Sequence, residues 1–408
     1  MISLTQLKLV VNNFSLYAIF LSLVFGQIIK MPLGLGGVTL LDLTLSAYTV
    51  FSAFYYKSLI KNIPIFIKVG FAFLGVATIS LIFTPLNLSF QETLNSFLYI
   101  FRIFVIFYFG WFVYSYKNTI FEKTHIFLLM SGITIALLGL VQLVLFPDLG
   151  FLESRGWDPH FFRLASSFID PNFTGGFLVL TIVLLMGLWN MLKFRKNYKI
   201  AVFILLYLAL TLTFSRSSYL MFLFSTTTFS AFLKSMRLAV LSITLFVLLF
   251  VSFWGYTQLV SKPRGIDRSA SASFRLTTWQ QGYTIWQKSP ILGVGFNAYK
   301  YALRDYKIAD KQFLNSRGST SNDFSLLHIL ATTGLVGLIF YLLLLSSLIY
   351  TGWKIFNISK DVTGVVLISG LVGLLAHSIF NNSLFYPFIL IWIMLIPTKY
   401  PFLTNQKK

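Results

Sequence analysis

The chain has 408 residues, of which 57% are hydrophobic and 11% charged, and its mean hydropathy is +0.79. This composition excludes a water-soluble globular protein and indicates a polytopic membrane protein. The formal net charge is +20 at pH 7. Because Lys and Arg are spread between apolar segments, we attribute this charge to membrane topology and anionic lipid, and we expect no nucleic acid partner.

Residue types that commonly bind metals are scarce. The chain has no Cys, which excludes disulfides and cysteine-based metal or nucleophilic sites. Its four His residues are scattered and lack the spacing of metal ligands. We therefore expect neither a metal nor a cofactor.

A membrane-spanning helix needs about 20 mostly apolar residues, because unpaired backbone groups are costly in hydrocarbon. Scanning on this basis predicts an all-α polytopic membrane protein with about twelve transmembrane helices. No small-residue cleavage site follows the first apolar run, so we expect that helix to be retained. The apolar segments lie at 14–29, 38–56, 64–83, 96–115, 125–146, 173–192, 199–214, 217–233, 238–258, 324–350, 363–380 and 383–398.

Short loops rich in Lys and Arg favour the cytoplasmic side of a membrane. Here such loops alternate along the chain, which predicts that both termini are cytoplasmic. The predicted division is residues 1–258 with nine transmembrane helices, an extracytoplasmic loop at 259–323, and residues 324–408 with three more helices and a cytoplasmic tail. The basic residues are Lys57, Lys61, Lys117, Lys123, Lys193, Arg195, Lys196, Lys199, Lys234, Arg237, Lys354 and Lys360.

The loop at 259–323 is the most basic part of the chain. Between Lys262 and Arg317 it carries ten Lys and Arg residues against three Asp residues. A loop of this length is translocated regardless of its charge, so it does not overturn the predicted topology. A basic, aromatic-rich segment of this kind needs an anionic partner.

The same loop contains signals for short helices. Aromatic residues spaced three to five apart in 270–287 predict an amphipathic helix at the membrane interface, with its aromatic side chains toward the bilayer. Pro290 ends this helix, and Gly293 and Gly295 predict a tight turn before a second short helix at 297–306. The polar residues 315–322 predict a flexible stretch that leads into the next apolar segment.

Arg216 lies between two closely spaced apolar segments. An Arg near the bilayer is costly unless it faces a cavity or a partner, and its planar fork matches a phosphate. The alternative is an interfacial Arg that reaches toward lipid headgroups. We favour phosphate binding because Ser215, Ser217 and Ser218 surround Arg216 with small hydroxyl side chains.

A second polar group, Arg163 with Asp170 and Asn172, precedes the sixth apolar segment. Pro171 and Asn172 suit a helix N-terminus, whose free amides and dipole favour an anion. We favour ligand contact for Arg163. For Asp170 an ordinary helix cap and a role in binding are equally compatible with the sequence.

Arg275 lies on the predicted interfacial helix, and its nearness to the two preceding arginines on one membrane face favours a phosphate role.

Asp323 lies at the point at which the loop re-enters the membrane. For a lone Asp at this position, the simplest interpretation is a helix N-cap. Trp279 and Asn322 complete the candidate substrate-binding residues. Arg102, inside the fourth apolar segment, either pairs with Glu92 or lines a cavity. Together these residues point to a substrate with a phosphate or diphosphate at the outer leaflet.

Three motifs, in this order, resemble the O-antigen polymerase and ligase superfamily of membrane glycosyltransferases. The first is Phe214-Ser-Arg216-Ser-Ser. The second is Phe274-Arg275-x-x-x-Trp279 followed by Ser289-Pro-Ile-Leu-Gly293-Val-Gly295. The third runs from Asp323 to Gly334-Leu-Val-Gly337. The resemblance covers about residues 163–345 and implies a GT-C-like helical fold, an undecaprenyl-diphosphate-linked glycan as donor, and no metal.

One departure from the family pattern concerns the ligase branch. Counting back from Gly334, the place of the ligase His-Asn pair falls on Asp323-Phe324, and His328 lies five residues further on. The resemblance therefore favours a Wzy-type polymerase over a WaaL-type ligase.

The sequence thus leads to one main hypothesis, a polysaccharide polymerase of O-antigen or capsule type in the bacterial inner membrane. Arg216 and Arg275, with Arg163, would bind the donor diphosphate, and Asp323 would be the general base. A chain-length regulator is a possible partner. The alternatives are an O-antigen ligase and a twelve-helix transporter or flippase, which would pair ionisable residues inside the bundle.

Overall fold

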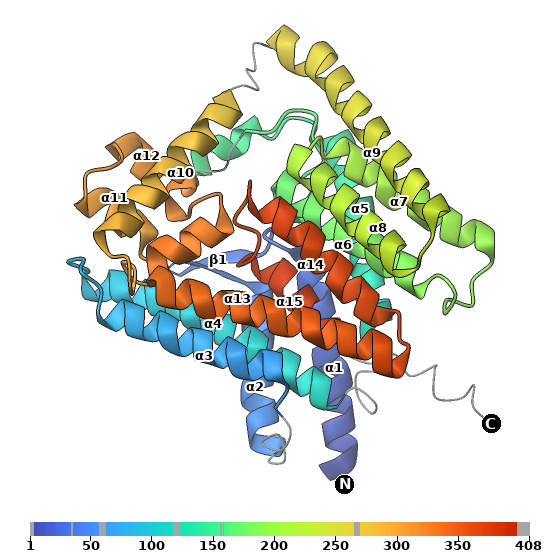
Figure 1. The fold of residues 1–408 in the computed structure, drawn as a ribbon, viewed down its shortest axis with the longest axis horizontal. Coiled ribbons are helices and arrows are strands. Elements are labelled where there is room, and N and C mark those ends of the chain that lie inside the picture. Colours follow the sequence, from blue (N-terminus) through green and yellow to red (C-terminus); the bar gives the residue numbers. More distant parts are fainter. Residues whose placement is uncertain are drawn as a thin grey trace.

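The computed structural model describes residues 4–33, 36–56, 63–116, 123–155, 157, 159–264 and 270–397. Each of the twelve predicted apolar segments contains a helix within these residues (Figure 1). The helices are α1 (Leu4–Phe25), α2 (Leu40–Tyr55), α3 (Ile65–Ile82), α4 (Phe90–Ser115), α5 (Thr124–Leu145), α6 (Pro171–Leu188), α7 (Lys196–Leu212), α8 (Arg216–Phe232), α9 (Met236–Tyr256), α13 (Ser325–Ser359), α14 (Thr363–Ser378) and α15 (Pro387–Leu395).

Six described helices are long and apolar enough to cross a membrane: α3, α4, α5, α6, α9 with the turn that follows it, and α13. Shorter apolar helices lie at Phe14–Phe25, in α2 and in α14. The predicted total of about twelve spans therefore stays a prediction. Lys57, Lys61, Lys117 and the tail at 398–408, which entered the topology argument, lie outside the described residues.

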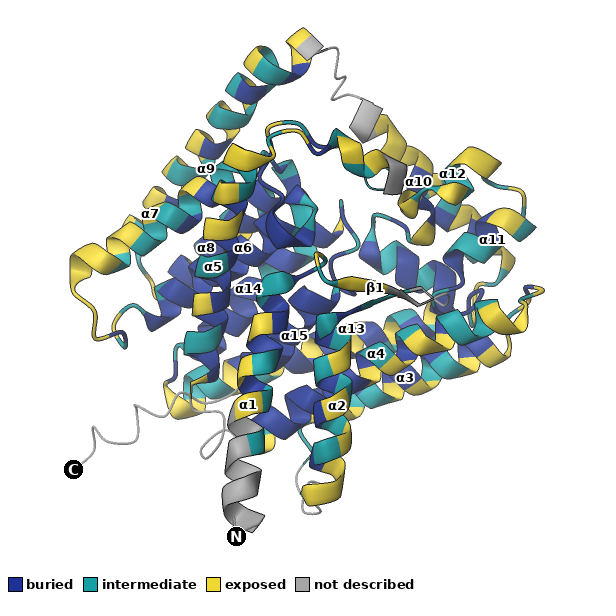
Figure 2. Cartoon of the chain, turned by 180° about the vertical axis from the view of Figure 1, so that it is seen from behind, coloured by how far each residue is buried: buried dark blue, intermediate teal, exposed yellow. Residues whose placement is uncertain are grey.

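The last predicted span, at 383–398, contains only a short helix. At 1.5 Å per residue, the nine residues of α15 extend about 14 Å, less than half of the roughly 30 Å hydrocarbon layer. All nine are buried, and Figure 2 shows α15 at the centre of the molecule together with α14. Protein, and not lipid, surrounds this helix.

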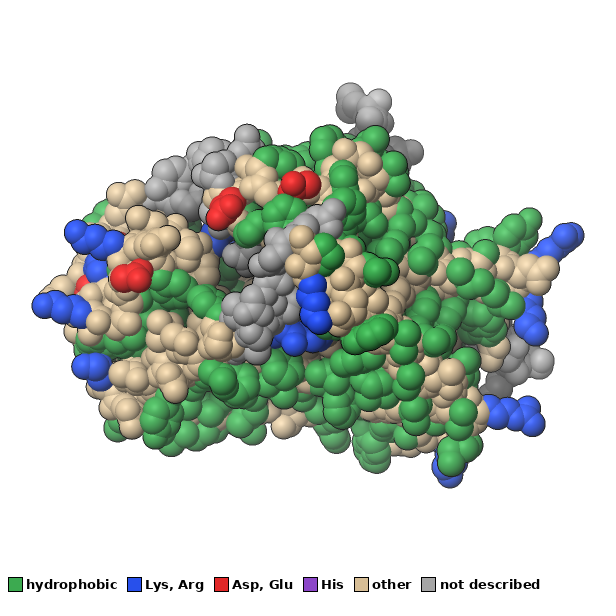
Figure 3. Space-filling view, turned by 90° about the horizontal axis from the view of Figure 1, so that it is seen from above, with side chains coloured by type: hydrophobic (Ala, Val, Ile, Leu, Met, Phe, Trp, Pro, Cys, Tyr) green, Lys and Arg blue, Asp and Glu red, His purple; other side chains and the backbone are tan. Residues whose placement is uncertain are grey.

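The outer surface of the bundle is apolar. Only 11% of the most apolar part of α9 is buried, against 83% for α6. Figure 3 shows hydrophobic side chains over much of one face, with Lys and Arg chiefly toward its two ends. An apolar surface of this extent needs a partner, and lipid is the one that a polytopic protein has.

A small β-hairpin departs from the all-α prediction. β1 (Lys30–Leu33) pairs antiparallel with β2 (Gly36–Thr39), with Lys30 opposite Thr39. Four-residue strands are too short to show the alternation by which strands are recognised in a sequence. At the end of β2, Thr39 and Asp42 form a capping box that starts α2.

The predicted loop contains α10 (Ala270–Lys288), α11 (Tyr299–Asp305), α12 (Lys311–Asn315) and the 3-10 turn η6 (Arg317–Thr320). They group together at one end of the molecule (Figure 1). The helices predicted at 270–287 and 297–306 are thus confirmed. On α10 the buried residues are Thr278, Gly282 and Ile285, whereas Phe274 and Tyr283 are exposed.

The stretch at 315–322, which we expected to be flexible, is ordered by packing. Its Ser319 and Asn322 are fully buried. The hydroxyl of Ser319 donates to the carbonyl oxygens of Leu314 and Ser316, at 3.0 and 2.8 Å. Small polar side chains that bond to nearby backbone produce this kind of compact turn, which composition alone does not separate from a flexible linker.

The loop is joined to the bundle by an interlock of two backbone segments. Helix α13 is broken at Gly334, where φ is 66° and ψ is −168°. Residues 290–295 lie along the break, and four backbone N–H groups donate across it: Val294 to Ala331 O (3.1 Å), Gly295 to Thr332 O (3.0 Å), Leu335 to Pro290 O (2.9 Å) and Val336 to Ile291 O (3.2 Å). These bonds pair groups that the broken helix would otherwise leave open.

Two glycines permit this interlock. A Cβ at Gly334 would lie 2.1 Å from the carbonyl oxygen of Ile291, and one at Gly293 would lie 2.4 Å from backbone atoms of Thr332 and Thr333. The conformation of Gly334 is in a region that is essentially restricted to glycine.

We predict that Gly334→Ala and Gly293→Ala each lower the free energy of unfolding by about 2 kcal/mol or more, because both the backbone angles and the available space exclude a side chain. The measurement is thermal unfolding of the purified protein in detergent. Gly75→Ala is the matched control, since a Cβ there meets nothing within 4 Å. Equal melting temperatures for all three variants would contradict the interlock.

Candidate functional site

The predicted site residues are carried by the ends of several helices and by α10. They lie at the N-termini of α6 and α8, on α10, at the start of α13, and beside the connection between α14 and α15. Two groups can be distinguished: a hydroxyl and amide network around α8, and a charged group around α10.

The turn between α7 and α8 is held by Arg163. Its Nε donates to the carbonyl oxygen of Thr213 at 2.9 Å, and its Nη2 donates to that of Phe214 at 3.2 Å. Phe214 has a positive φ of 45°, and the next residue, Ser215, caps α8. The buried guanidinium of Arg163 therefore positions the turn that presents Arg216. A direct ligand contact for Arg163 stays a prediction.

Hydroxyl and amide side chains connect α6, α8 and α14 beside this turn. Ser215 Oγ donates to Asn172 Oδ1 at 2.8 Å, and Ser218 Oγ lies 2.9 Å from Ser215 Oγ. Ser217 Oγ accepts from Asn381 Nδ2 at 2.7 Å. The predicted residues Asn172, Ser215 and Ser217 are thus brought together.

The network also contains two residues that the sequence analysis missed, His377 and Asn381. His377 Nε2 lies 3.2 Å from the carbonyl oxygen of Asn172, so this nitrogen carries the hydrogen. Nδ1 is then an acceptor, and within the described residues it has no hydrogen-bond partner. The available signal was the pair Asn381 and Asn382 inside an apolar stretch, which we used only to divide two segments.

Asp170 is the cap of α6. Its Oδ1 accepts from the backbone N–H of Asn172 at 2.6 Å and from that of Phe173 at 3.3 Å. The capping alternative is thus confirmed, and it does not exclude a second role. The carboxylate of Asp170 also interacts electrostatically with Arg275.

Arg275 is half-buried and interacts electrostatically with two carboxylates. Burial lowers the pKa of its guanidinium, and the charges of Asp323 and Asp170 oppose that shift. The guanidinium lies 5.6 Å from the ring centre of Phe380, which follows α14. Trp279, four residues along α10, packs on Phe380 and Phe324 at 6.4 and 5.7 Å. Arg275 and Trp279 thus share one aromatic surface.

Asp323 is not the helix cap that its position suggested. α13 begins at Ser325, its cap residue is Phe324, and no side chain caps it. Asn322 bonds this turn instead, because its Oδ1 accepts from the N–H of Phe324 at 2.9 Å. Asp323 itself is half-buried and interacts electrostatically with Arg275.

Asn322 is a buried anchor for the start of α13. Its Nδ2 donates to the carbonyl oxygen of Thr278 and, at 3.1 Å, to Tyr299 Oη. Its backbone N–H donates to His328 Nδ1 at 3.2 Å. A Cβ at Gly282 of α10 would lie 2.6 Å from Asn322 Nδ2, so glycine is needed there for the close approach. Asn322 therefore positions its neighbour Asp323.

The two remaining arginines contact other parts of the bundle. Arg216 is half-buried, with its guanidinium 5.6 Å from the ring centre of Phe253 on α9. Arg102 pairs with Asp42, whereas Glu92 pairs with Arg304, so the first of the two alternatives for Arg102, pairing with Glu92, is wrong. Glu92 also closes the capping box of α4, which commits it to that end of the helix.

Among the described residues, no three His, Asp or Glu side chains are grouped to hold a metal ion.

Residues 200–342 match the family model Wzy_C, O-antigen ligase. The match supports the O-antigen ligase and polymerase superfamily and does not separate the two branches. It contains Arg216, Arg275 and Asp323, whereas Arg163 and Asp170 precede it. No curated protein matches the chain. Together with the apolar helices, the match indicates a multi-pass bacterial inner-membrane protein that is similar, over residues 200–342, to a family of glycosyltransferase-like membrane enzymes.

We predict that Asn322→Ala loosens the start of α13, because three buried polar groups lose their partner at about 1–3 kcal/mol each. Amide hydrogen exchange should become faster in α10 and around Asp323 while the rest of the bundle keeps its protection. The matched control is Asn315→Ala, an exposed Asn of the same loop. Unchanged exchange in Asn322→Ala would contradict the positioning role.

Proposed function

We propose that this protein is a polysaccharide polymerase. It transfers a growing glycan from undecaprenyl diphosphate to the non-reducing end of a carrier-linked repeat unit at the outer leaflet, without a metal and with inversion at the anomeric carbon. The observation that carries this proposal is Arg275, which is half-buried, lies 5.6 Å from the ring centre of Phe380 and interacts electrostatically with both Asp323 and Asp170. The partial family match supports glycan chemistry of this class.

In the proposed reaction the bond between the anomeric carbon and the diphosphate oxygen breaks, and negative charge grows on the leaving diphosphate. Arg275 and Arg216 stabilise that charge, which is the role that Arg has in phosphoryl transfer. The guanidinium of Arg275 is already partly removed from water, so its interaction with a diphosphate is less screened than at an open surface.

The acceptor hydroxyl oxygen forms the new bond to the anomeric carbon, and its proton passes to the carboxylate of Asp323. The products are the extended glycan, still linked to the acceptor carrier, and free undecaprenyl diphosphate. Asp323 suits this role because Asn322 bonds the turn in its place, so the Asp323 carboxylate is not used as the cap of α13.

The position of His328 favours the polymerase branch. His328 is buried, and its Nδ1 accepts the backbone N–H of Asn322, so this nitrogen is engaged in holding the loop.

An O-antigen ligase is the second candidate, and the description of the matching family favours it. A transporter should pair charges within the bundle, whereas Arg102 pairs with Asp42 in the first turn of α2.

We predict that Arg275→Gln, Arg216→Ala and Asp323→Asn each abolish visible polymer, since loss of one charge-stabilising group costs about a factor of 100 to 1,000 in rate. The measurement is gel profiling of surface glycan from a deletion strain complemented with each variant. The expected pattern is a ladder from wild type and single repeat units from the variants.

The control is Arg304→Gln, which removes an exposed Arg of the same loop whose surface ion pairs contribute little. It should restore the ladder. Full-length polymer retained on its lipid carrier in the deletion strain would identify a ligase. A normal ladder from Arg275→Gln, with the protein present in the membrane, would overturn the proposed role of Arg275.

A further inference from the structure

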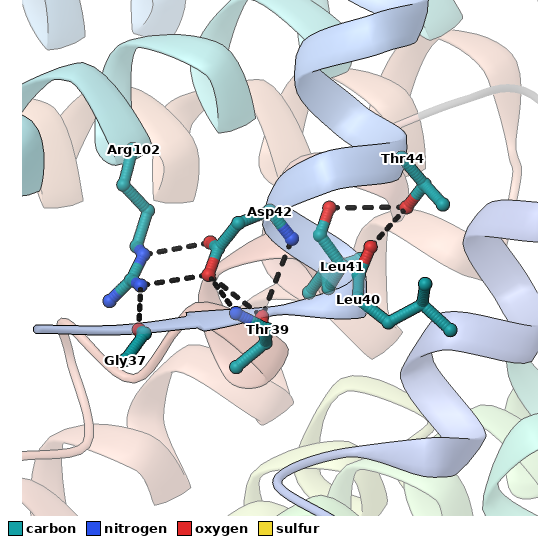
Figure 4. Close-up of polar contacts among 7 residues, drawn as sticks. All are labelled: Gly37, Thr39, Leu40, Leu41, Asp42, Thr44 and Arg102. Atoms are coloured by element: carbon teal, nitrogen blue, oxygen red, sulfur yellow. Dashed lines mark hydrogen bonds and ion pairs between the residues drawn. The ribbon is translucent and has the colours of Figure 1, made fainter. Parts of the chain in front are cut away.

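The pair of Arg102 and Asp42 fixes the β-hairpin to α4 (Figure 4). Arg102 donates from Nε and Nη2 to the two carboxylate oxygens of Asp42 at 2.7 Å each, and its Nη2 also donates to the carbonyl oxygen of Gly37 at 3.1 Å. Asp42 additionally accepts from the backbone N–H and the hydroxyl of Thr39 at 2.8 Å. The carboxylate of Asp42 is therefore fully engaged.

The side chain of Lys30, in strand β1 of the hairpin, lies next to Gly37, whose carbonyl oxygen accepts from Arg102. A Cβ on Gly37 would be 1.5 Å from Lys30 Cε and 2.7 Å from Nζ, so Gly37 leaves room for the lysine side chain. Lys30 is accessible to solvent, yet burial by surrounding protein lowers the pKa of its ammonium. The charges of Arg317 and Arg102 lower that pKa further, and only Asp42 opposes them.

Arg317, in the predicted loop, interacts electrostatically with Lys30. Its guanidinium lies 3.7 Å from the ring centre of Trp157, a cation–π contact with the segment between α5 and α6. Burial lowers the pKa of Arg317 as well. Within the described residues, neither Lys30 nor Arg317 forms an ion pair.

Among the described residues, the charges that act on Lys30 are thus two further cations from separate segments and one carboxylate, Asp42, which is already engaged. Bringing like charges together in a partly desolvated place costs free energy unless an anion binds there. A planar guanidinium beside an ammonium suits the oxygens of a phosphate.

This cluster, Lys30 with Arg102 and Arg317, is near the candidate site but separate from it. The backbone N–H of Gln27, just before the hairpin, donates to the carbonyl oxygen of Ser167 at 2.8 Å. Ser167 precedes Asp170 of the candidate site by three residues, so this bond joins the two regions. Arg102 lies over the ring of Tyr99 at 4.7 Å, and Tyr386 interacts electrostatically with both Tyr99 and Asp170. The charges that act on Lys30 are those of the cluster and do not include Arg275 or Asp323.

We propose that Lys30 and Arg317, supported by the pair of Arg102 and Asp42, form a second binding site for a phosphate group borne on a membrane lipid. If the proposed polymerase function holds, on which this step rests, the ligand is the carrier diphosphate of the acceptor. The acceptor reacts at its non-reducing end, which is separated from its diphosphate by a whole repeat unit. Its phosphate must therefore be held apart from Asp323 but at the same membrane face.

The test is equilibrium binding of radiolabelled farnesyl diphosphate to the full-length protein in phosphatidylcholine nanodiscs. We expect two equivalents for wild type and one for Lys30→Gln/Arg317→Gln, with affinity for the second equivalent reduced about tenfold or more. Arg275→Gln should lose the other equivalent. Lys311→Gln, which removes an exposed Lys of the same loop, is the control for charge alone and should keep both.

Nanodiscs that contain phosphatidylglycerol distinguish the two lipid sources. Unchanged binding of the second equivalent supports the carrier diphosphate, and its loss in wild type assigns the site to an anionic headgroup and overturns the acceptor role. Equal binding by Lys30→Gln/Arg317→Gln and Lys311→Gln overturns the site itself. The binding experiment measures no glycan transfer. A ligase phenotype in the glycan ladder would therefore overturn the proposed polymerase function without changing the binding result.

Discussion

The position of the candidate site depends on the backbone interlock between residues 290–295 and the break in α13 at Gly334. Four N–H groups donate across it, and Ser80 of α3 adds a hydroxyl that lies 2.5 Å from the Leu292 carbonyl oxygen and 2.7 Å from that of Thr332. Since Arg275 precedes this segment and Asp323 precedes α13, the same contact sets both ends of the charged group. A helix could not remain broken inside an apolar bundle without such partners.

Around this fixed point the site is built from residues that orient others. Arg163 holds the carbonyl oxygens before Ser215, Asn322 bonds the turn beside Asp323, and Asp170 caps α6. Each of these side chains satisfies backbone groups that would otherwise be unpaired at a helix end. Arg216 thus follows an ordered turn, and Arg275 lies on the helix α10, so both are presented from ordered backbone, which is the condition for electrostatic stabilisation of a leaving group without reorganisation.

Hydropathy predicted every long apolar helix of the described residues, because apolar length is a property of the sequence alone. Asp323 and Asp170, which interact electrostatically with Arg275, were already candidates from the sequence, but their proximity to Arg275 was not predicted. The hairpin and the partner of Arg102 were missed because they depend on contacts between Lys30, Gly37 and Asp42 that no local pattern encodes. His377 was missed because a single His in an apolar helix carries no signal until Asn172 is placed beside it.

The short helix α15 has a consequence for how the bundle tolerates change. Its nine residues are buried among other helices, and Trp392 is among the largest fully buried side chains. Removing methyl groups from Ile391 or Ile393 would therefore leave a cavity in close-packed protein, as in the interior of a soluble enzyme. Lipid cannot flow in to fill that space. The centre of this membrane protein thus follows the packing rules of a water-soluble core, while its periphery is governed by the bilayer.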